Sequence, residues 1–324
     1  MTALALVPAF PETASFALTT DQARIESYVR QSRAKSTLRG YRSDWREFEA
    51  WCNDRGAPAM PASQEALCGY LAACADRGLK AGSIQRRLSA IAAAHTTHGL
   101  ESPTNKAAVR LCMAGIRRAL GVHQEGKSAV LTADLVAMLA HLPDNLLGIR
   151  DRALLLMGFA GAFRRSELVG LDVQDLEFTS EGLKALIRRS KTDQEGEGQR
   201  IGIAFGMNET TCPVRAIQAW LAAAGITEGP VFRHVDRHGN VKSERLGDRA
   251  VALVVKRYAH AAGLASEKYA GHSLRAGLVT QASINQVPEI VIMRQTRHKS
   301  SDMLRRYIRE TTLFRDNASA RVGL

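Results

Sequence analysis

The chain has 324 residues, enough for two domains, and its hydrophobic fraction of 45% is ordinary for a packed globular protein. Its five cysteines form neither a CxxC pair nor a Cys/His metal spacing, and their odd number argues against a disulfide framework as well as a zinc site. No stretch approaches the ~20 apolar residues of a membrane span, which argues against an integral membrane protein. The formal net charge of +12 is shared evenly, with 17 basic and 11 acidic residues in 1–127 and 27 and 21 in 128–324. This suits a protein that grips a polyanion with two domains, although a merely basic globular protein would show the same excess.

The first half of the chain predicts an all-α domain over residues 20–121, preceded by a loose tail over 1–19. The tail has no Lys or Arg ahead of its apolar residues, so it does not resemble a secretory signal, and cysteines that read as reduced point to the cytoplasm. Apolar residues recur three and four apart, and the chain breaks near Gly56 and at Gly121. The expected helices cover about 20–33, 36–52, 63–76, 82–97 and 105–120.

Two of these helices carry residues that suit DNA. Arginine, glutamine and serine on an exposed helix face match the major groove and its flanking phosphates. A solvated helix face carries the same residue types, so the helices alone favour neither interpretation. The candidate DNA-contacting residues are Arg39, Arg42 and Arg46 on the second expected helix and Ser83, Gln85, Arg86 and Arg87 on the fourth.

A polar segment at 122–130 predicts a linker, and residues 131–324 predict a second domain of mixed structure. Alternation over 173–178 and β-like runs at 183–189 and 200–204 predict one small antiparallel sheet, with Lys191 in the polar loop between the last two runs. The remaining segments predict helices, so the whole chain is expected to be mainly α with a small antiparallel β-sheet. These helices cover about 132–141, 146–159, 213–224, 248–262, 272–283 and 288–296, and residues 161–171 predict a turn into a short helix.

Two pairs of side chains in the second domain are spaced to act together. Arg164 and Glu167 lie three residues apart on one helical face, where the carboxylate can orient the guanidinium. His272 and Arg275 have the same spacing at the start of a helix, whose N-terminal amides face an anion. An Arg-Glu pair is normally a surface ion pair and a His-x-x-Arg pattern is short, so neither pair is decisive alone.

The C-terminal stretch adds a possible nucleophile. Tyr307 lies in a short basic helix, nine residues after His298. A tyrosine can attack a phosphorus centre if cations surround the phosphate, and phosphoryl transfer asks little else of a protein. A single tyrosine, histidine or loop lysine is more often packing or solvated, so only the ordered set, Arg164, Lys191, His272, Arg275, His298 and Tyr307, carries the argument.

That ordered set resembles the tyrosine recombinase (phage integrase) family. The run Arg164-Arg165-Ser166-Glu167-Leu168 is similar to the first conserved box of the family, and His272-Ser273-Leu274-Arg275-Ala276-Gly277 is similar to the second. The nine-residue step from His298 to Tyr307 also matches, and the helical first half and the Tyr307-Ile308-Arg309 ending are Cre-like. The resemblance covers about 23–312, and it implies a helical core-DNA-binding (SAM-like) domain followed by a mixed α/β catalytic domain clamped round DNA.

The resemblance also implies a division of work around one phosphate. Tyr307 would attack the scissile phosphate, leaving a 3′-phosphotyrosyl link and a free 5′-hydroxyl, and Lys191 would protonate the departing 5′-oxygen. Arg164 and Arg275 would bind the non-bridging oxygens.

Three further residues would support this chemistry. His298 would donate a hydrogen bond to the phosphate, His272 would assist proton transfer at the tyrosine, and Glu167 would steady the site. The covalent link keeps the bond energy, so the implied reaction needs no cofactor, metal or ATP.

The sequence departs from the family pattern at three points. Arg165 stands where an apolar residue is usual, which leaves a choice of arginine that the spacing to Ser166 settles in favour of Arg164. Thr296-Arg297-His298 replaces the common Leu-Gly-His. Lys184 is a second candidate for the role of Lys191, because it also lies near the expected sheet.

The expected function is site-specific recombination of double-stranded DNA at paired half-sites. The family docks its C-terminal segment into a neighbouring subunit of a cyclic tetramer, and Leu313 and Phe314 are the candidate anchors here, unless they pack on their own domain. A type IB topoisomerase-like relaxing activity and a non-catalytic DNA-binding regulator are the alternatives. The sequence does not reveal the target site, the direction of exchange or any accessory protein.

Overall fold

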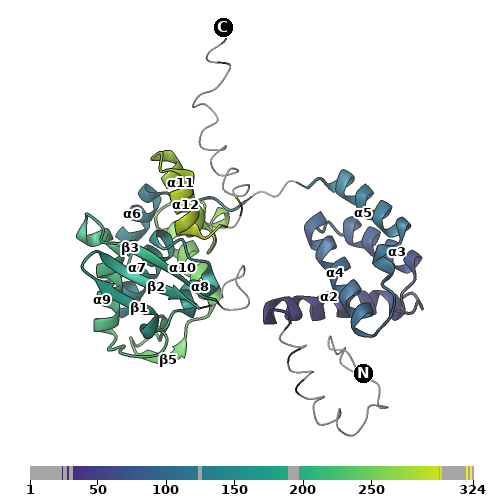
Figure 1. Cartoon of the computed structure of the whole chain (residues 1–324), viewed down its shortest axis with the longest axis horizontal. Coiled ribbons are helices and arrows are strands. Elements are labelled where there is room, and N and C mark those ends of the chain that lie inside the picture. The colour runs from purple at the N-terminus through teal and green to yellow at the C-terminus, as the bar shows by residue number, and fades with distance from the viewer. Residues whose placement is uncertain are drawn as a thin grey trace. The chain divides into compact units, whose positions relative to one another are not determined.

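The structure is a computed structural model that describes residues 32–122, 126–188 and 197–298, together with the isolated positions 24, 28, 300, 319 and 322. It separates into two compact units, Met1–Glu125 and Gly126–Leu324 (Figure 1). No helix in these described ranges is long and apolar enough to cross a membrane.

The described part of the first unit is helical, with helices α2 (Lys35–Asn53), α3 (Gln64–Asp76), α4 (Ala81–Thr97) and α5 (Ala107–Leu120) and a 3₁₀ turn at Pro103–Asn105. Helix α2 packs on α4 and α3 packs on α5. Trp45, Phe48 and Tyr70 are buried at the centre, and the Phe48 and Tyr70 rings meet edge to face with centroids 5.0 Å apart. Large aromatic side chains of this kind bury much apolar area, which holds short helices together.

The second unit is mainly α with small antiparallel sheets, which confirms the expected fold class. Strands β1 (Leu176–Thr179), β2 (Gly182–Ile187) and β3 (Gln199–Ala204) form an antiparallel sheet in that order, and Leu183 and Ala185 of β2 lie opposite Ile203 and Ile201 of β3 on its buried face. The helices are α6 (Thr132–Ala140), α7 (Leu146–Ala160), α8 (Arg165–Gly170), α9 (Pro213–Ala223), α10 (Asp248–Ala261), α11 (Ser273–Ile284) and α12 (Glu289–Thr296).

Helix α7 lies at the centre of this unit and contacts α8, α9, α10 and α11. Leu154, Leu155 and Met157 of α7 are fully buried in the core. Helix α11 approaches the chain at Val130 so closely that a Cβ on Gly277 would lie 2.0 Å from the Val130 carbonyl oxygen, so only glycine fits there. The ends of α7 and α11 therefore have fixed positions, and the candidate site is built at these ends.

Two elements differ from the sequence expectation. Residues Val173–Asp175 form a 3₁₀ turn rather than the start of a strand, because the Asp175 carboxylate accepts the Asp172 N–H at 2.9 Å and curls the chain. A second hairpin of β4 (Arg233–Val235) and β5 (Val241–Arg245) was not predicted, because its strands are short and polar. Its turn is organised by Asp236, whose carboxylate accepts the N–H groups of His238 and Asn240, both at 2.9 Å.

The end of the expected linker is attached to the second unit. The Ser128 N–H donates to the Lys268 carbonyl at 2.8 Å, and the Val130 N–H donates to the Ser273 carbonyl at 3.0 Å. Residues 123–125 of the expected linker and residues 1–19 lie outside the described residues.

Candidate active site

Arg164 and Glu167 meet at the start of α8. Arg164 is the N-cap residue, and the Glu167 side chain turns back to accept its backbone N–H at 2.8 Å and its guanidinium Nη1 at 2.6 Å. Ser166-Glu167-Leu168 folds this way because Leu168 is buried in the core and a carboxylate three residues past the N-cap satisfies a free helix amide. The Arg164 guanidinium is therefore held by the carboxylate of a side chain that is itself 1% exposed.

Arg275, in the first turn of α11, is the second buried cation of the site. The residue is 6% exposed, and its two terminal nitrogens donate to the Ala162 carbonyl at 2.6 Å and to the Thr296 carbonyl. Ala162 has a positive φ of 45°, which turns its carbonyl out of α7 where the helix has ended. A planar fork can bridge two such carbonyls, and this fixes the direction in which the guanidinium points.

Arg297, at the end of α12, is a second cation that contacts the Glu167 carboxylate. Its Nη2 donates to Glu167 Oε2 at 2.8 Å and to the Ala162 carbonyl at 3.1 Å, and its guanidinium lies over the Phe163 ring at 5.6 Å. Burial alone would raise the pKa of Glu167, but the charge of Arg297 and the hydrogen bonds from Arg164 outweigh it and hold that pKa below its ordinary value. The sequence patterns did not predict this second cation on Glu167.

His298 follows directly and is tied to Thr296. The Thr296 hydroxyl donates to the Ile292 carbonyl at 2.7 Å and lies 2.9 Å from His298 Nδ1. Because a hydroxyl has one proton, it must accept from Nδ1, so the neutral imidazole carries its proton there and Nε2 has none. Burial and then the charges of Arg275, Arg164 and Arg297 lower the pKa of His298 to about 4. Donation from Nε2 to a phosphate therefore requires the ring to gain a proton, which an arriving anion favours.

His272 and Arg165 lie at the edge of this group. His272 caps α11 and is exposed, and a Cβ on the preceding Gly271 would lie 2.1 Å from Cδ of Arg165, so the Arg165 chain crosses closely over that glycine. The Arg165 guanidinium points to Asp248 at 3.8 Å, not to Glu167. Of the two adjacent arginines, it is Arg164 that joins Glu167, as the spacing predicts.

The structure thus brings together four of the expected residues, Arg164, Glu167, Arg275 and His298, with His272 nearby on α11. Tyr307, Lys191, Leu313 and Phe314 lie outside the described residues. Lys184, the alternative to Lys191, forms an exposed ion pair with Glu177 at 2.7 Å. No group of three or more His, Cys, Asp or Glu side chains in the described parts of the chain could hold a metal ion.

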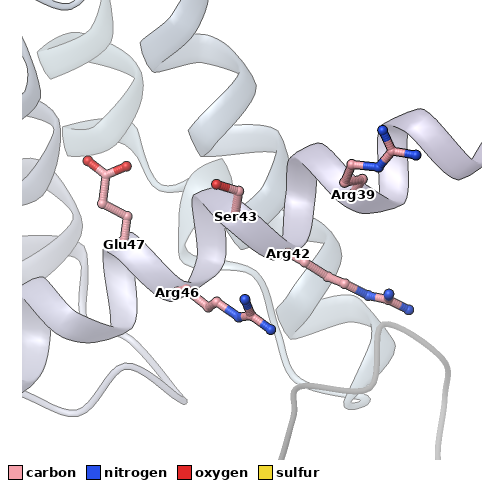
Figure 2. A pocket seen from close by; sticks show the side chains of 5 residues that line it. All are labelled: Arg39, Arg42, Ser43, Arg46 and Glu47. Carbon is pink, nitrogen blue, oxygen red and sulfur yellow. The ribbon is translucent and has the colours of Figure 1, made fainter. Parts of the chain in front are cut away.

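In the first unit, the candidate DNA-contacting arginines of α2 lie together. Arg39, Arg42 and Arg46 are exposed and, with Ser43 and Glu47, line an open hollow of ≈ 610 Å³ (Figure 2). Figure 2 shows Arg42 and Arg46 extending away from the helix bundle, while Glu47 points toward it.

The candidates on α4 are more varied. Ser83 is exposed, Gln85 accepts a hydrogen bond from Arg117, and Arg86 clasps Asp44 through two bonds of 2.9 Å. Arg87 has an 11% exposed side chain that contacts Glu47 at 2.5 Å and donates to the Tyr70 hydroxyl at 2.8 Å. The sequence offered Arg86 and Arg87 as DNA contacts in the first turns of this helix, but the structure gives both an internal partner. Helix α4 therefore offers a backbone phosphate fewer free donors than expected.

Comparison with known proteins assigns both units. Residues 129–313 match the phage integrase family model, and residues 26–96 match the model of the phage integrase N-terminal SAM-like domain. The chain is 42% identical over 299 residues to an integrase/recombinase xerD homolog of Selenomonas ruminantium, a match that covers 91% of this chain and 87% of that protein. It is also 25% identical over 284 residues to the recombinase cre of Escherichia phage P1, covering 81% of each.

Solved structures show the same fold. The structure of the Tn1549 transposon integrase in complex with transposon right end DNA aligns with a TM-score of 0.60 at 16% identity, over 95% of this chain and 99% of that one. At this identity the likeness concerns the arrangement of the elements, which agrees with a helical first unit and a mainly α second unit with small sheets.

Proposed function

The chain belongs to the phage integrase family and is a tyrosine-type site-specific recombinase, and from this premise we propose that it breaks and rejoins duplex DNA through a 3′-phosphotyrosyl intermediate without metal or ATP. The observation that carries the proposal is the group of Arg164, Arg275 and His298, which gathers the starts of α8 and α11 and the end of α12. Two guanidiniums and a histidine gathered in this way suit the equatorial oxygens of a phosphate that gains charge in the transition state.

In the proposed reaction the phenolic oxygen of Tyr307 bonds to phosphorus and the 5′-oxygen leaves. The phenolic proton passes toward His272, and Lys191 gives a proton to the 5′-oxygen. Arg164 and Arg275 hold the non-bridging oxygens, and His298, protonated as the phosphate arrives, donates from Nε2. The reverse sequence with another 5′-hydroxyl rejoins the strands.

The proposed partner is duplex DNA with paired half-sites, held by both units. Arg39, Arg42 and Arg46 are the candidate contacts of the first unit, supported by their exposure around one hollow. We further propose a homotetramer on DNA, joined through the C-terminal segment with Leu313 and Phe314 as anchors, and action in the cytoplasm at the nucleoid. Truncation before Leu313 is expected to impair tetramer assembly more than the binding of one half-site; equal loss of both would contradict the docking proposal.

The decisive experiment traps and sequences the bound DNA. The full chain is incubated with fragmented, nicked genomic duplex in EDTA, and DNA that stays attached to protein in detergent is recovered. We expect adducts with free 5′-hydroxyl ends that share a sequence, and none from Tyr307→Phe. An adduct with Tyr307→Phe would show a wrong nucleophile, and loss of adducts in EDTA would contradict the metal-free mechanism. Tyrosine-dependent relaxation of any plasmid, without strand exchange, would favour the topoisomerase-like alternative.

A further inference from the structure

Arg297 occupies a backbone position that does not favour an arginine. It ends α12 in the left-handed region, with φ 59° and ψ 38°, a conformation that glycine or asparagine adopts more easily. Its side chain is nevertheless 4% exposed and buried among polar groups, where its Nη1 donates to the Gly161 carbonyl at 3.3 Å and its Nη2 reaches Glu167. A residue with a strained backbone and a buried charge must be stabilised by these partners.

We infer that Arg297 is a positioning residue that offsets the charge of Glu167, so that Glu167 can orient Arg164 without cancelling the positive charge that Arg164 presents to the phosphate. The inference deepens the proposed recombination and rests on it. The two Glu167 oxygens divide the work: Oε1 accepts from Arg164 Nη1, and Oε2 accepts from the Arg164 N–H and from Arg297 Nη2.

The net charge of the group depends on Arg297. Arg164, Glu167 and Arg297 together carry one net positive charge, whereas Arg164 and Glu167 alone would carry none. A phosphodiester gains negative charge as it is attacked, so a neutral pair would stabilise the transition state far less than a cationic trio would. The Glu167 and Arg297 side chains are 1% and 4% exposed, which keeps water from screening this difference.

The state of His298 supports the same account. The charged side chains that act on it are Arg275 from α11, Arg164 from the start of α8 and Arg297 from the end of its own helix. Burial lowers its pKa first and the charges of all three arginines lower it further, so Arg297 contributes to the potential at His298, which is proposed to contact the phosphate. The Arg297 guanidinium also covers Phe163, a contact that an apolar side chain of similar length would keep.

The test separates charge from packing with four variants of the full chain. Arg297→Met keeps length and removes charge, Arg297→Lys keeps charge and loses the fork, and the double variant Arg297→Met/Glu167→Gln restores one net positive charge. Arg150→Met is the matched control, since Arg150 is also buried against a carboxylate, Asp151, at 2.7 Å. Binding of inorganic phosphate to the DNA-free protein is followed by the NMR shifts of the His298 ring.

We expect Arg297→Met to weaken phosphate binding about ten-fold, as removal of a nearby charge should in a partly desolvated site. The double variant should recover most of that loss, and Arg297→Lys should lie between. Arg150→Met should lower the melting temperature but leave phosphate binding unchanged. A double variant no better than Arg297→Met would overturn the inference in favour of packing, as would unchanged binding by Arg297→Met or no saturable binding by the wild type.

A second readout distinguishes this inference from the proposed function. The rate of covalent-complex formation on the recovered DNA should fall in Arg297→Met and rise again in the double variant. If the wild type forms no covalent complex with any DNA, the proposed function fails, while the phosphate titrations still decide whether Arg297 offsets Glu167.

Discussion

The two units use arginine–carboxylate pairs in opposite ways. In the helical unit, Glu47 is 37% exposed and receives Arg77 at 2.7 Å and Arg87 at 2.5 Å, so the pairs link α2 to its neighbours at the protein surface. In the second unit, Glu167 is 1% exposed and lies between Arg164 and Arg297. An exposed pair such as Arg77–Glu47 contributes little because water screens it, and the less exposed Arg87 contributes more to stability. The pairs of the buried Glu167 also fix geometry and keep their field.

The same contrast separates support from chemistry. The surface pairs of α2 and α4 brace the helices and leave Arg39, Arg42 and Arg46 extended into solvent. In the second unit, Arg164, Glu167 and Arg297 converge on one place. Because their charges are fixed there, the protein need not rearrange when a phosphate gains charge. Substitutions at these pairs should therefore change stability in the first unit and reaction rate in the second.

The largest expected effect is on catalysis at Arg275. Arg275→Lys keeps the charge but cannot bridge the Ala162 and Thr296 carbonyls with a planar fork, so the charge moves from its fixed position. We expect covalent-complex formation at saturating DNA to slow by about 100-fold, or about 3 kcal/mol. Arg237→Lys, in the exposed β4–β5 turn, is the control, and a slowing no greater than that of the control would show that the fork does not matter.

The next effect concerns stability in the helical unit. Arg87→Met should lower the free energy of unfolding of this unit by about 2 kcal/mol, because Glu47 and the Tyr70 hydroxyl each lose a charged partner. Arg77→Met is the matched control, since the Arg77 side chain is 48% exposed and its pair with the same Glu47 should contribute less than ~1 kcal/mol. Hydrogen exchange of the α2 and α4 amides in the full chain measures both. Equal loss in the two variants would contradict the importance of burial.

A smaller effect is expected at Thr296. Thr296→Val keeps the shape and removes the hydroxyl that accepts from His298 Nδ1 and donates to the Ile292 carbonyl. The ring can then adopt the other tautomer or turn away, and we expect about ten-fold slower covalent-complex formation. Thr296→Ser should behave like the wild type. Nitrogen NMR of His298 that shows the same tautomer in Thr296→Val and wild type would disprove this role.

The sequence predicted those site residues that stand at a short, fixed spacing along the chain. Arg164 with Glu167 and His272 with Arg275 could be found from their spacing of three residues. The structure joins Arg164 to Glu167 as expected, but through a helix cap and not across a helix face, because Arg164 is the N-cap of α8. The fold class could be predicted from helix-length apolar periods, and most expected helices agree with the observed ones to within two residues.

Other features depend on contacts between distant residues and could not be predicted. The bond from Arg297 to Glu167 spans 130 positions, and only the departure of Thr296-Arg297 from Leu-Gly indicated that anything unusual occurs there. The left-handed conformation of Arg297 explains why glycine is usual at this position, and the bond to Glu167 stabilises the arginine that stands there instead. Similarly, Arg87 looked like an exposed helix residue, and its bond to Tyr70 depends on how α3 packs on α4.

A weaker dependence on pH follows from the His298 environment. The pKa of this ring is about 4 in the fold against 6.5 for an ordinary histidine. Between these values the unfolded chain takes up a proton that the folded chain refuses, so stability is complete above pH 6.5 and falls as the pH drops toward 4. Allowing for solvent screening of a half-buried ring, the loss should be about 1 kcal/mol, and His298→Asn should remove it. Urea unfolding at several pH values measures this, and an identical pH dependence in His298→Asn would refute the assignment.

The smallest effect on stability is expected on the open face of α2. Arg42→Gln and Arg46→Gln should change the free energy of unfolding by less than ~0.5 kcal/mol, since both side chains are exposed. If these arginines contact phosphates, each loss should reduce by about one the slope of log affinity against log salt for a mixed-sequence duplex, because one fewer counterion is released. Arg86→Gln should reduce the slope less, since the Arg86 guanidinium already clasps Asp44 through two hydrogen bonds. If all three variants have the same salt slope as the wild type, the DNA lies on another face of the helical unit. If the salt slope falls equally in all three, DNA draws Arg86 away from its internal partner.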